Sequence, residues 1–558
     1  MRLLLLLVTV ASAADLKLTP AWTYDTRDST DAAKGGGKRP ALEVTPVYDG
    51  GRLYISTPWG TVAALEATTG REIWRVDLKV NPKGDYGDFT SRGVSLRGTR
   101  LYVGTVDGRL VCLEKLDGAH CAGFGEIDLT KGLRRGPRYV GEYGVTSAPA
   151  IFEDLVITGS AISDNSRLDM ATGEVRAFDS MTGKLRWTFH PLREESKAGA
   201  ANTWSRIVVD QASGLVFLPV GSASPDYFGG ERPGDNRYAN CVVALSGRTG
   251  EVVWSFQTVH HDIWDYDVAS PPELYLYKGR KAIAVGSKTG HLFLLDRLTG
   301  VPIFGVEERP VPASTTPGEV AAKTQPFPLK PQALVKQQVT EQDIDPSCVE
   351  NFRKLRNDGI FTPPSERGSL IVPGNIGGMH WGGAVWAAKD KMLVMPVNDL
   401  PAVIRMIPQD RFRAERAEFP NRETTEQKGT AYAMSREFFL TPSGVPCVAK
   451  PWGSLVGVNT ETGEIAWRAK LGEWPNLGGL ALSKGGHVFV GADFGAFLRA
   501  YDPRTGEKIG EWALPTSARA KPMTFEEGGH EYVVIAAGGH DAPMSKIDTK
   551  IVAFRIGK

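Results

Sequence analysis

Short apolar runs, each three to five residues long, recur along the chain between polar, Gly-rich segments. They are rich in Val, Ile, Leu, Tyr and Phe, residues that favour β-strands. The runs are Leu53–Ile55, Leu101–Gly104, Leu155–Ile157, Leu215–Leu218, Ala282–Gly286, Met392–Met395, Val488–Gly491 and Tyr532–Ile535. This spacing predicts a repeated unit that is built from strands.

A turn motif accompanies these runs. An apolar strand leads into a tight turn that ends in Thr-Gly or Asp-Gly, often with a Trp or Phe four residues later. The clearest copies are Gly70 with Trp74 and Gly183 with Trp187, and weaker copies end at Gly118, Gly250, Gly300, Gly463 and Gly506. A strand repeat of roughly 40–65 residues is typical of a β-propeller, in which each repeat forms one blade.

The two patterns together predict the fold. The chain has eight apolar runs but only seven turns. The segment between Gly300 and Gly463 contains one run and no turn, so we expect one blade to lack the turn. The prediction is an all-β, eight-bladed β-propeller of four-stranded antiparallel blades, forming a single domain over residues 14–558. A closed ring removes exposed sheet edges. A large β-sandwich or two smaller all-β domains are the alternatives.

Composition agrees with this fold class. The chain has 558 residues, of which 42% are hydrophobic and 23% charged, and 13 Trp and 63 Gly suit a turn-dense β protein. The net charge is +1, so no basic surplus indicates a nucleic-acid partner.

The N-terminus has the features of a cleaved signal peptide over residues 1–13. Arg2 provides the positive charge, Leu3–Val10 the apolar core and Ala11–Ala13 the small residues of a cleavage site. This apolar run is too short to span a bilayer, and no later segment is a transmembrane candidate. The sequence therefore predicts a periplasmic protein without a transmembrane segment.

Five cysteines fit an oxidising compartment. Cys112 and Cys121 lie on either side of a turn and could pair across a hairpin, and Cys348 and Cys447 could close a long loop. The odd count leaves at least one thiol free, and Cys241 is the remaining residue.

Residues 306–370 interrupt the repeat and are expected to form an irregular insertion. This segment is rich in Pro and contains a predicted helix over Pro346–Asn357, with Asp345 as its N-cap and Gly359 just beyond its end. Such insertions often cover one face of a propeller and shape its site, although composition fits a plain surface excursion equally well.

Several polar groups are not required for packing. The densest is Thr258–Asp267, which holds two His and three Asp residues, but their spacing matches no zinc pattern and the carboxylates could simply cap turns. Other candidates are Trp204, Ser224, the pair Asp164 and Asn165, and Lys288. A lone Lys is usually a solvated surface residue.

These stretches resemble the pyrroloquinoline quinone (PQQ)-dependent dehydrogenases, in particular the catalytic domain of the membrane glucose and quinate dehydrogenases. The resemblance covers about residues 43–554, and its most specific stretches are His260–Asp265, Gly359–Glu366, Pro373–Asn375 and Val534–His540. It implies oxidation of an alcohol, sugar or cyclic secondary alcohol by hydride transfer to PQQ. The electrons would pass to a separate cytochrome c or ubiquinone.

The resemblance also implies how the cofactor is held. Trp204 would be the flat surface on which the quinone stacks, and Arg92 would pair with a carboxylate or quinone oxygen. Lys288 would lie beside the reactive carbonyls and stabilise negative charge. Further polar contacts would come from Glu43, Thr146, Ser147 and Asn375.

A metal ion is implied as well. Ca²⁺ would be bound by oxygen atoms of Asp164, Ser224 and Asp265, with Asn165 as a further ligand. Mg²⁺ or a lanthanide is the alternative, and Asp267 could add a ligand for a trivalent ion. Asp265 would be the catalytic base.

Departures from the family pattern concern substrate and acceptor. Asp88 stands where glucose enzymes carry a His near the substrate, which places glucose in doubt and leaves other sugars, polyols and cyclic alcohols open.

The rival hypothesis is a non-catalytic scaffold of the outer-membrane assembly type. Those lipoproteins carry an N-terminal Cys and lack the Trp, Asp and Lys set, whereas this chain has that set and no such Cys.

Overall fold

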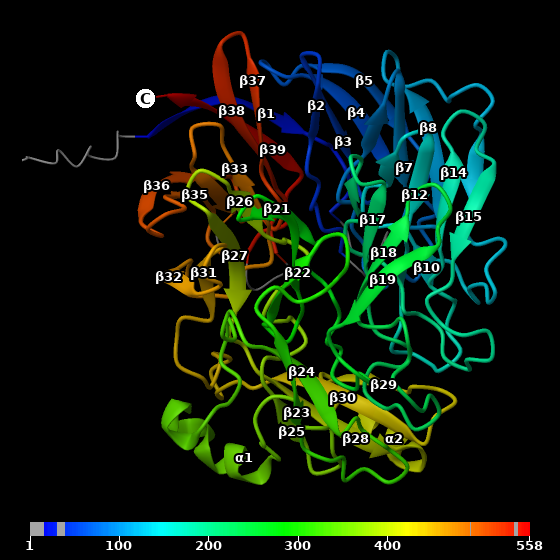
Figure 1. Cartoon of the computed structure of the whole chain (residues 1–558), viewed down its shortest axis with the longest axis vertical. Coiled ribbons are helices and arrows are strands. Elements are labelled where there is room, and N and C mark those ends of the chain that lie inside the picture. The colour runs from blue at the N-terminus through cyan, green and yellow to red at the C-terminus, as the bar shows by residue number, and fades with distance from the viewer. Residues whose placement is uncertain (1–15, 31–38, 492, 541–544, 558) are drawn as a thin grey trace, which may run out of the picture.

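The protein is almost entirely β-sheet in a computed structural model, which describes residues 16–30, 39–491, 493–540 and 545–557. Figure 1 shows the sheets arranged around a centre, with a separate layer of strands and short helices at the bottom. The predicted signal peptide lies outside the described residues. No helix in the described part of the chain has the length and apolar character needed to cross a membrane.

Eight antiparallel sheets follow one another along the described residues. The first four, in strand order, are β2 (Val47–Asp49), β3 (Arg52–Ser56), β4 (Thr61–Glu66), β5 (Glu72–Asp77); β6 (Ser95–Arg97), β7 (Arg100–Gly104), β8 (Arg109–Glu114), β9 (Glu126–Asp128); β11 (Ala150–Phe152), β12 (Leu155–Thr158), β14 (Val175–Asp179), β15 (Leu185–Phe189); and β16 (Val208–Asp210), β17 (Leu215–Pro219), β18 (Cys241–Ser246), β19 (Val252–Gln257). The other four are β20 (Glu273–Tyr277), β21 (Arg280–Gly286), β22 (Leu292–Asp296); β26 (Val385–Ala387), β27 (Met392–Asn398), β31 (Gly453–Asn459), β32 (Ile465–Lys470); β33 (Leu480–Leu482), β34 (Val488–Gly491), β35 (Phe497–Tyr501), β36 (Lys508–Ala513); and β37 (Met523–Glu527), β38 (His530–Ala537), β39 (Lys550–Gly557), β1 (Lys17–Asp25).

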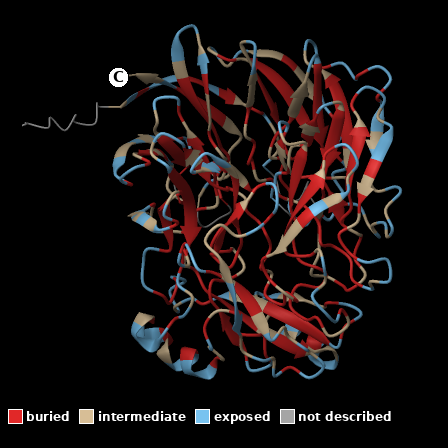
Figure 2. Ribbon diagram, viewed as in Figure 1, coloured by how far each residue is buried: buried red, intermediate tan, exposed pale blue. Residues whose placement is uncertain are grey.

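Each predicted apolar run is the second strand of one of these sheets. The runs correspond to β3, β7, β12, β17, β21, β27, β34 and β38. Their side chains are buried on both faces, which explains why the runs are continuous rather than alternating. Figure 2 shows the same burial along the inner parts of the sheets. The predicted all-β class is confirmed; since one sheet has only three described strands, the count of eight blades stays a prediction.

The turn motif has a fixed place, and this corrects one expectation. In six of these sheets it joins the third strand to the fourth, and the copy at Gly300 follows β22, the third strand of the three-stranded sheet. The run in β27 and the turn at Gly463 belong to one sheet, so none of the eight repeat sheets has lost its turn between Gly300 and Gly463. The eighth sheet lacks the turn because its fourth strand is β1, from the N-terminal end of the described chain.

The Trp of the motif joins neighbouring sheets. Trp22 in β1 has the equivalent place in the eighth sheet: its ring lies against Gly70, where an added Cβ would come within 2.5 Å of the ring, and its Nε1 donates a hydrogen bond to Ala67 O at 2.9 Å. Only Gly leaves room for this contact. The same contact recurs for Trp74 on Gly118, Trp187 on Gly250, Trp254 on Gly300 and Trp467 on Gly506.

Two excursions from the repeat form the layer at the bottom of Figure 1. The predicted insertion holds the hairpin β23 (Val306–Pro310) and β24 (Thr324–Pro328), 3-10 turns at Glu341–Asp343 and Pro346–Cys348, and α1 (Val349–Lys354). The predicted helix is thus shorter than expected, although Asp345 does cap its start by accepting from Ser347 N.

The second excursion, between β27 and β31, was not predicted. It contains β28 (Ala402–Pro408), a 3-10 turn at Gln409–Arg411, α2 (Phe412–Glu418), β29 (Glu423–Thr425) and β30 (Tyr432–Phe438). These strands form a further sheet with β25 (Ser369–Ile371), in the order β25, β28, β30, β29.

Two disulfides confirm the expected pairs. Cys112 bonds Cys121 across the end of β8, and Cys348 bonds Cys447, which ties α1 to the second excursion. Among the described residues Cys241 is the free thiol, and it is buried in the fourth sheet.

Candidate active site

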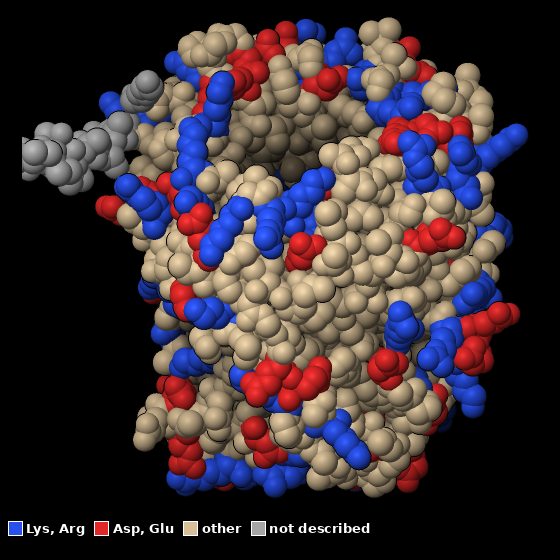
Figure 3. Space-filling view, in the orientation of Figure 1, with Lys and Arg blue, Asp and Glu red and all other residues tan. Residues whose placement is uncertain are grey.

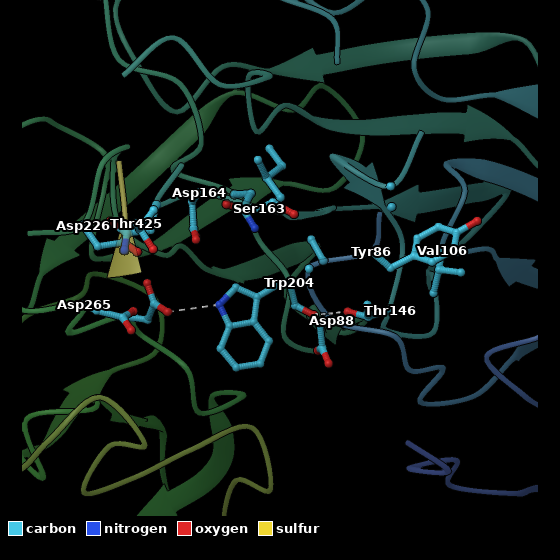
Figure 4. Close-up of a pocket in the computed structure, with 18 of the residues that line it drawn as sticks. Tyr86, Asp88, Val106, Thr146, Ser163, Asp164, Trp204, Asp226, Asp265 and Thr425 are labelled. Carbon is cyan, nitrogen blue, oxygen red and sulfur yellow. Dashed lines mark hydrogen bonds between the residues drawn. The ribbon is translucent and has the colours of Figure 1, made fainter. Parts of the chain in front are cut away.

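A cavity of about 270 Å³ lies where loops between the sheets meet the inserted strands β29 and β30. The short pair β10 (Tyr143–Gly144) and β13 (Ala161–Ile162) forms one wall. Figure 4 shows the ring of Trp204 at its centre, with acidic side chains on one side. Seven predicted site residues line it: Asp88, Thr146, Asp164, Asn165, Trp204, Asp265 and Lys288.

Trp204 is held in one orientation by a buried carboxylate. Its Nε1 donates to Asp267 Oδ2 at 3.2 Å, the dashed line in Figure 4, and Asp267 Oδ1 accepts from Ser222 N at 2.7 Å. Asp267 is therefore fixed by the backbone and in turn fixes the indole. The result is a flat aromatic face presented to the cavity.

Lys288 lies in the turn between β21 and β22 and reaches two carboxylates. Its Nζ is 2.5 Å from Asp265 Oδ1 and 2.9 Å from Asp267 Oδ2. Burial opposes the charge of Lys288, but the two carboxylates outweigh that effect and hold its pKa well above the usual value. The ammonium is thus a fixed positive charge beside the Trp204 ring.

The acidic side of the cavity holds more carboxylates than cations. Burial, followed by the charges of neighbouring Asp residues, raises the pKa of Asp164 to about 8. Burial also raises the pKa of Asp265 to about 7 and that of Asp226 well above its usual value. Such carboxylates repel one another unless a further cation is bound between them.

The oxygen atoms suit a hard divalent ion. Asn165 Oδ1 and Asp226 Oδ1 are buried and accept no hydrogen bond from the described residues. Amide and carboxylate oxygens are the ligands that Ca²⁺ prefers. Within the described ranges no three His, Cys, Asp or Glu side chains already converge on one metal position, so binding would draw the carboxylates together.

Ser224 lies apart from this set. It is buried, its hydroxyl donates to Arg167 O, and it does not line the cavity. Asp226, two residues later, does line it. Sequence reasoning selected Ser224 and not Asp226, although a carboxylate is the stronger ligand type for Ca²⁺.

Arg92 lies over the Trp204 ring. Its guanidinium carbon is 5.4 Å from the centroid of Trp204 and 4.8 Å from that of Trp381. The same guanidinium is 2.9 Å from both Glu43 Oε2 and Asp88 Oδ2. Because Glu43 is fully buried behind Arg92, its contact with a ligand would be through Arg92.

Two further predicted contacts, like Arg92 and Glu43, lie outside the first cavity. Ser147 Oγ donates to Trp204 O at 2.7 Å, so this hydroxyl fixes the backbone that carries the ring. Asn375 lines a neighbouring cavity of about 560 Å³, where its Oδ1 is buried without a hydrogen-bond partner in the described part of the chain. Glu423 and Arg436 line both cavities.

Arg436 is a site residue that sequence reasoning missed. It projects from β30, its Nη1 is 3.4 Å from Asp265 Oδ2 and 3.0 Å from Tyr227 Oη, and its Nη2 is 2.6 Å from Glu423 Oε1. Both oxygens of Asp265 therefore face cations. No motif marked Arg436, because only the unpredicted second excursion brings it to the site.

Comparisons with known proteins agree with this geometry. Residues 8–533 match the PQQ family described as glucose/ethanol/alcohol dehydrogenase, beta-propeller domain. The quinoprotein glucose dehydrogenase A of Acinetobacter calcoaceticus is 34% identical over 97% of this chain and 76% of that protein. The quinate/shikimate dehydrogenase (quinone) of Acinetobacter baylyi is 31% identical over 94% of this chain and 73% of its own length.

A solved structure shares the fold. The quinohemoprotein alcohol dehydrogenase of Comamonas testosteroni superposes with a TM-score of 0.71 at 23% identity, covering 96% of this chain and 76% of that chain. These matches favour an oxidoreductase over a non-catalytic scaffold. With the β-propeller, the aromatic face and the acidic cluster in place, the chain belongs to the PQQ-dependent dehydrogenase family.

Proposed function

We propose that this protein oxidises a hydroxyl group of an alcohol, sugar or cyclic secondary alcohol, with PQQ and a divalent cation bound in the Trp204 cavity. The observation that carries the proposal is one cavity that holds a flat aromatic face, a fixed ammonium and an excess of buried carboxylates. Each of these features serves a planar, electron-accepting cofactor next to a metal ion.

The cofactor would lie on the ring of Trp204, with Arg92 at its edge and Thr146 beside it. Ca²⁺ would be held by Asp164, Asn165, Asp226 and Asp265, with Ser224 supporting the same loop. When bound, PQQ accepts a hydride from the substrate carbon, and the cation polarises the quinone carbonyl. Mg²⁺ or a lanthanide would fit the same oxygen set.

Asp265 would take the proton of the substrate hydroxyl. A general base must lie within hydrogen-bond reach of the proton that it removes, and Asp265 faces the cavity. Lys288 Nζ, held by Asp265 and Asp267, is placed to stabilise the negative charge that develops on the cofactor oxygens.

Asp88 would contact the substrate at the mouth. Its side chain is 42% exposed and lines the cavity opposite the acidic cluster, across the Trp204 ring in Figure 4. We further propose that the protein acts in the periplasm, as its predicted signal peptide indicates, and passes its electrons to a separate cytochrome c or ubiquinone.

Reconstitution tests the proposal. Purified apoprotein should oxidise an alcohol and sugar panel, with a dye as electron acceptor, only when both PQQ and Ca²⁺ are added. Chelation should abolish the activity and Ca²⁺ should restore it. Apoprotein with NAD in place of PQQ is the control, and full activity there would exclude the proposal.

A further inference from the structure

A second cavity, of about 580 Å³, lies on the other side of the Trp204 layer. Thr146 and Trp204 line the first cavity, whereas their sequence neighbours Ser147 and Ser205 line the second. Its wall is formed by the first strands of four successive sheets, β2, β6, β11 and β16. Figure 3 shows a hollow where Figure 1 places β2, with Lys and Arg side chains along its edge. We call this cavity the channel.

Most of the channel wall is apolar. The apolar lining residues are Val47, Val94, Leu96, Ala148, Pro149, Ala150, Ile151, Ile207, Val208, Val209, Pro271 and Trp381. Such a surface favours an aromatic ligand over a hydrated ion, because apolar area is removed from water when the ligand binds. The first cavity, lined mainly by polar side chains, differs in this respect.

Two cations line the channel without a direct ion pair to any described residue, although the buried carboxylate of Glu273 is close enough to interact with both. Arg206 and Lys521 both line it, and neither makes an ion pair or side-chain hydrogen bond with the residues that the structure describes. They lie close enough to repel each other: burial and the charge of Arg206 lower the pKa of Lys521 to about 8, and the nearby Glu273 only partly offsets this. Arg92 lines the inner end, where its Nε has no hydrogen-bond partner among the described residues.

The channel reaches the proposed cofactor position. Trp381 lines it, and the Arg92 guanidinium lies between Trp381 and Trp204, at 4.8 Å and 5.4 Å from the two ring centroids. A ligand in the channel would therefore be separated from a ring on Trp204 by a single layer of side chains. The substrate cavity opens elsewhere, beside Asp88 and Glu423.

We propose that the channel is a second binding site, for a small aromatic oxidant of the quinone type that presents carbonyl or anionic oxygens to Arg206 and Lys521. This inference rests on the proposed function. In one cycle the hydroxyl carbon is oxidised to a carbonyl, with loss of two electrons and two protons. The oxidant takes up both and leaves as its reduced, dihydroxy or hydroxy-amine form, so substrate and acceptor use separate openings.

Direct binding is the first test. The probe is 8-anilinonaphthalene-1-sulfonate, an aromatic anion whose fluorescence rises in apolar sites, titrated into apoprotein and into protein loaded with PQQ and Ca²⁺. Lys521→Gln and Arg206→Gln should each weaken its affinity by roughly threefold to fivefold, the effect of one partly exposed charge pair. Lys389→Gln, which alters an exposed Lys outside the channel, is the matched control and should bind like wild type.

Steady-state kinetics is the second test. The acceptor 2,6-dichlorophenolindophenol is an anionic quinone-imine that takes up two electrons. Its KM should rise by a similar factor in both channel variants, while the KM of the alcohol or sugar stays unchanged.

Wild-type dye affinity in both channel variants would overturn the site. An unchanged acceptor KM, or reduction of cytochrome c but not of the quinone-type dye, would overturn its role. If loaded protein oxidises nothing with any acceptor, the proposed function fails, and the titration of apoprotein still decides whether the channel binds an aromatic anion.

Discussion

Asp267→Asn tests whether Asp267 holds Trp204 and Lys288 in place, and it leaves the proposed catalytic base Asp265 unchanged. Oδ2 of Asp267 accepts from both Trp204 Nε1 and Lys288 Nζ, and Oδ1 accepts from Ser222 N. An asparagine has one oxygen and one NH₂ group. Whichever way the asparagine side chain turns, its NH₂ group faces at least one of these donors. The hydrogen bonds on that side of Asp267 are therefore lost.

The expected cost follows from these contacts. The bonds from Lys288 and from Trp204 both end on the Asp267 carboxylate, so each is charge-assisted and contributes roughly 1.5–3 kcal/mol. Lys288 keeps Asp265 as a partner, so its charge is not left alone. We expect the free energy of unfolding of the apoprotein to fall by about 2–4 kcal/mol in urea titrations.

PQQ affinity, measured by quenching of protein fluorescence, should fall as well because the Trp204 ring loses its anchor. Asp390→Asn is the control, since that carboxylate makes no ion pair or side-chain hydrogen bond with the described residues, and it should change neither quantity. Stability and PQQ affinity both equal to wild type in Asp267→Asn would refute the reasoning.

Three further predictions concern the base, the aromatic face and a disulfide. Asp265→Asn should lower kcat by about 10²–10⁴ at saturating PQQ and Ca²⁺, while the quinone absorbance of the purified protein shows full occupancy; near wild-type turnover would exclude this base. Trp204→Ala should weaken PQQ binding in a titration followed by quinone absorbance, which does not depend on the fluorescence of the removed Trp, and an unchanged affinity would place the cofactor elsewhere. Replacing both Cys348 and Cys447 by Ser opens a loop with a sequence separation of 99 residues and should lower the free energy of unfolding by about 2–5 kcal/mol; equal urea midpoints for the variant and wild type would contradict this.

The fold could be predicted because its signals are local. Each turn requires a Gly, and the Trp four residues later packs on the next turn, as Trp74 does on Gly118. Both residues therefore recur at a fixed spacing that a single sequence displays. The eighth turn could not be assigned, because a missing turn looks the same whether it was lost or replaced by a strand from the other end of the chain.

The site was predicted less completely, for a related reason. The family resemblance assigns roles to Trp204, Asp164 and Asp265, and the structure brings them to one cavity. Arg436 reaches that cavity only through the sheet of the second excursion, and Lys521 faces the channel through the closing sheet. Neither position has a local signal, since three-dimensional proximity alone gives it a role.

The pairing of β1 with β39 determines when the last sheet can be completed during folding. Lys17 lies opposite Gly557, so the last sheet needs residues from both ends of the sequence. The strand partner of β1 does not exist until the residues of β39 have been made, and until then one edge of β1 is uncovered. Contacts between such distant residues form slowly. The open ring is therefore the state most exposed to aggregation, and its lifetime is set by how quickly the first strand finds the last.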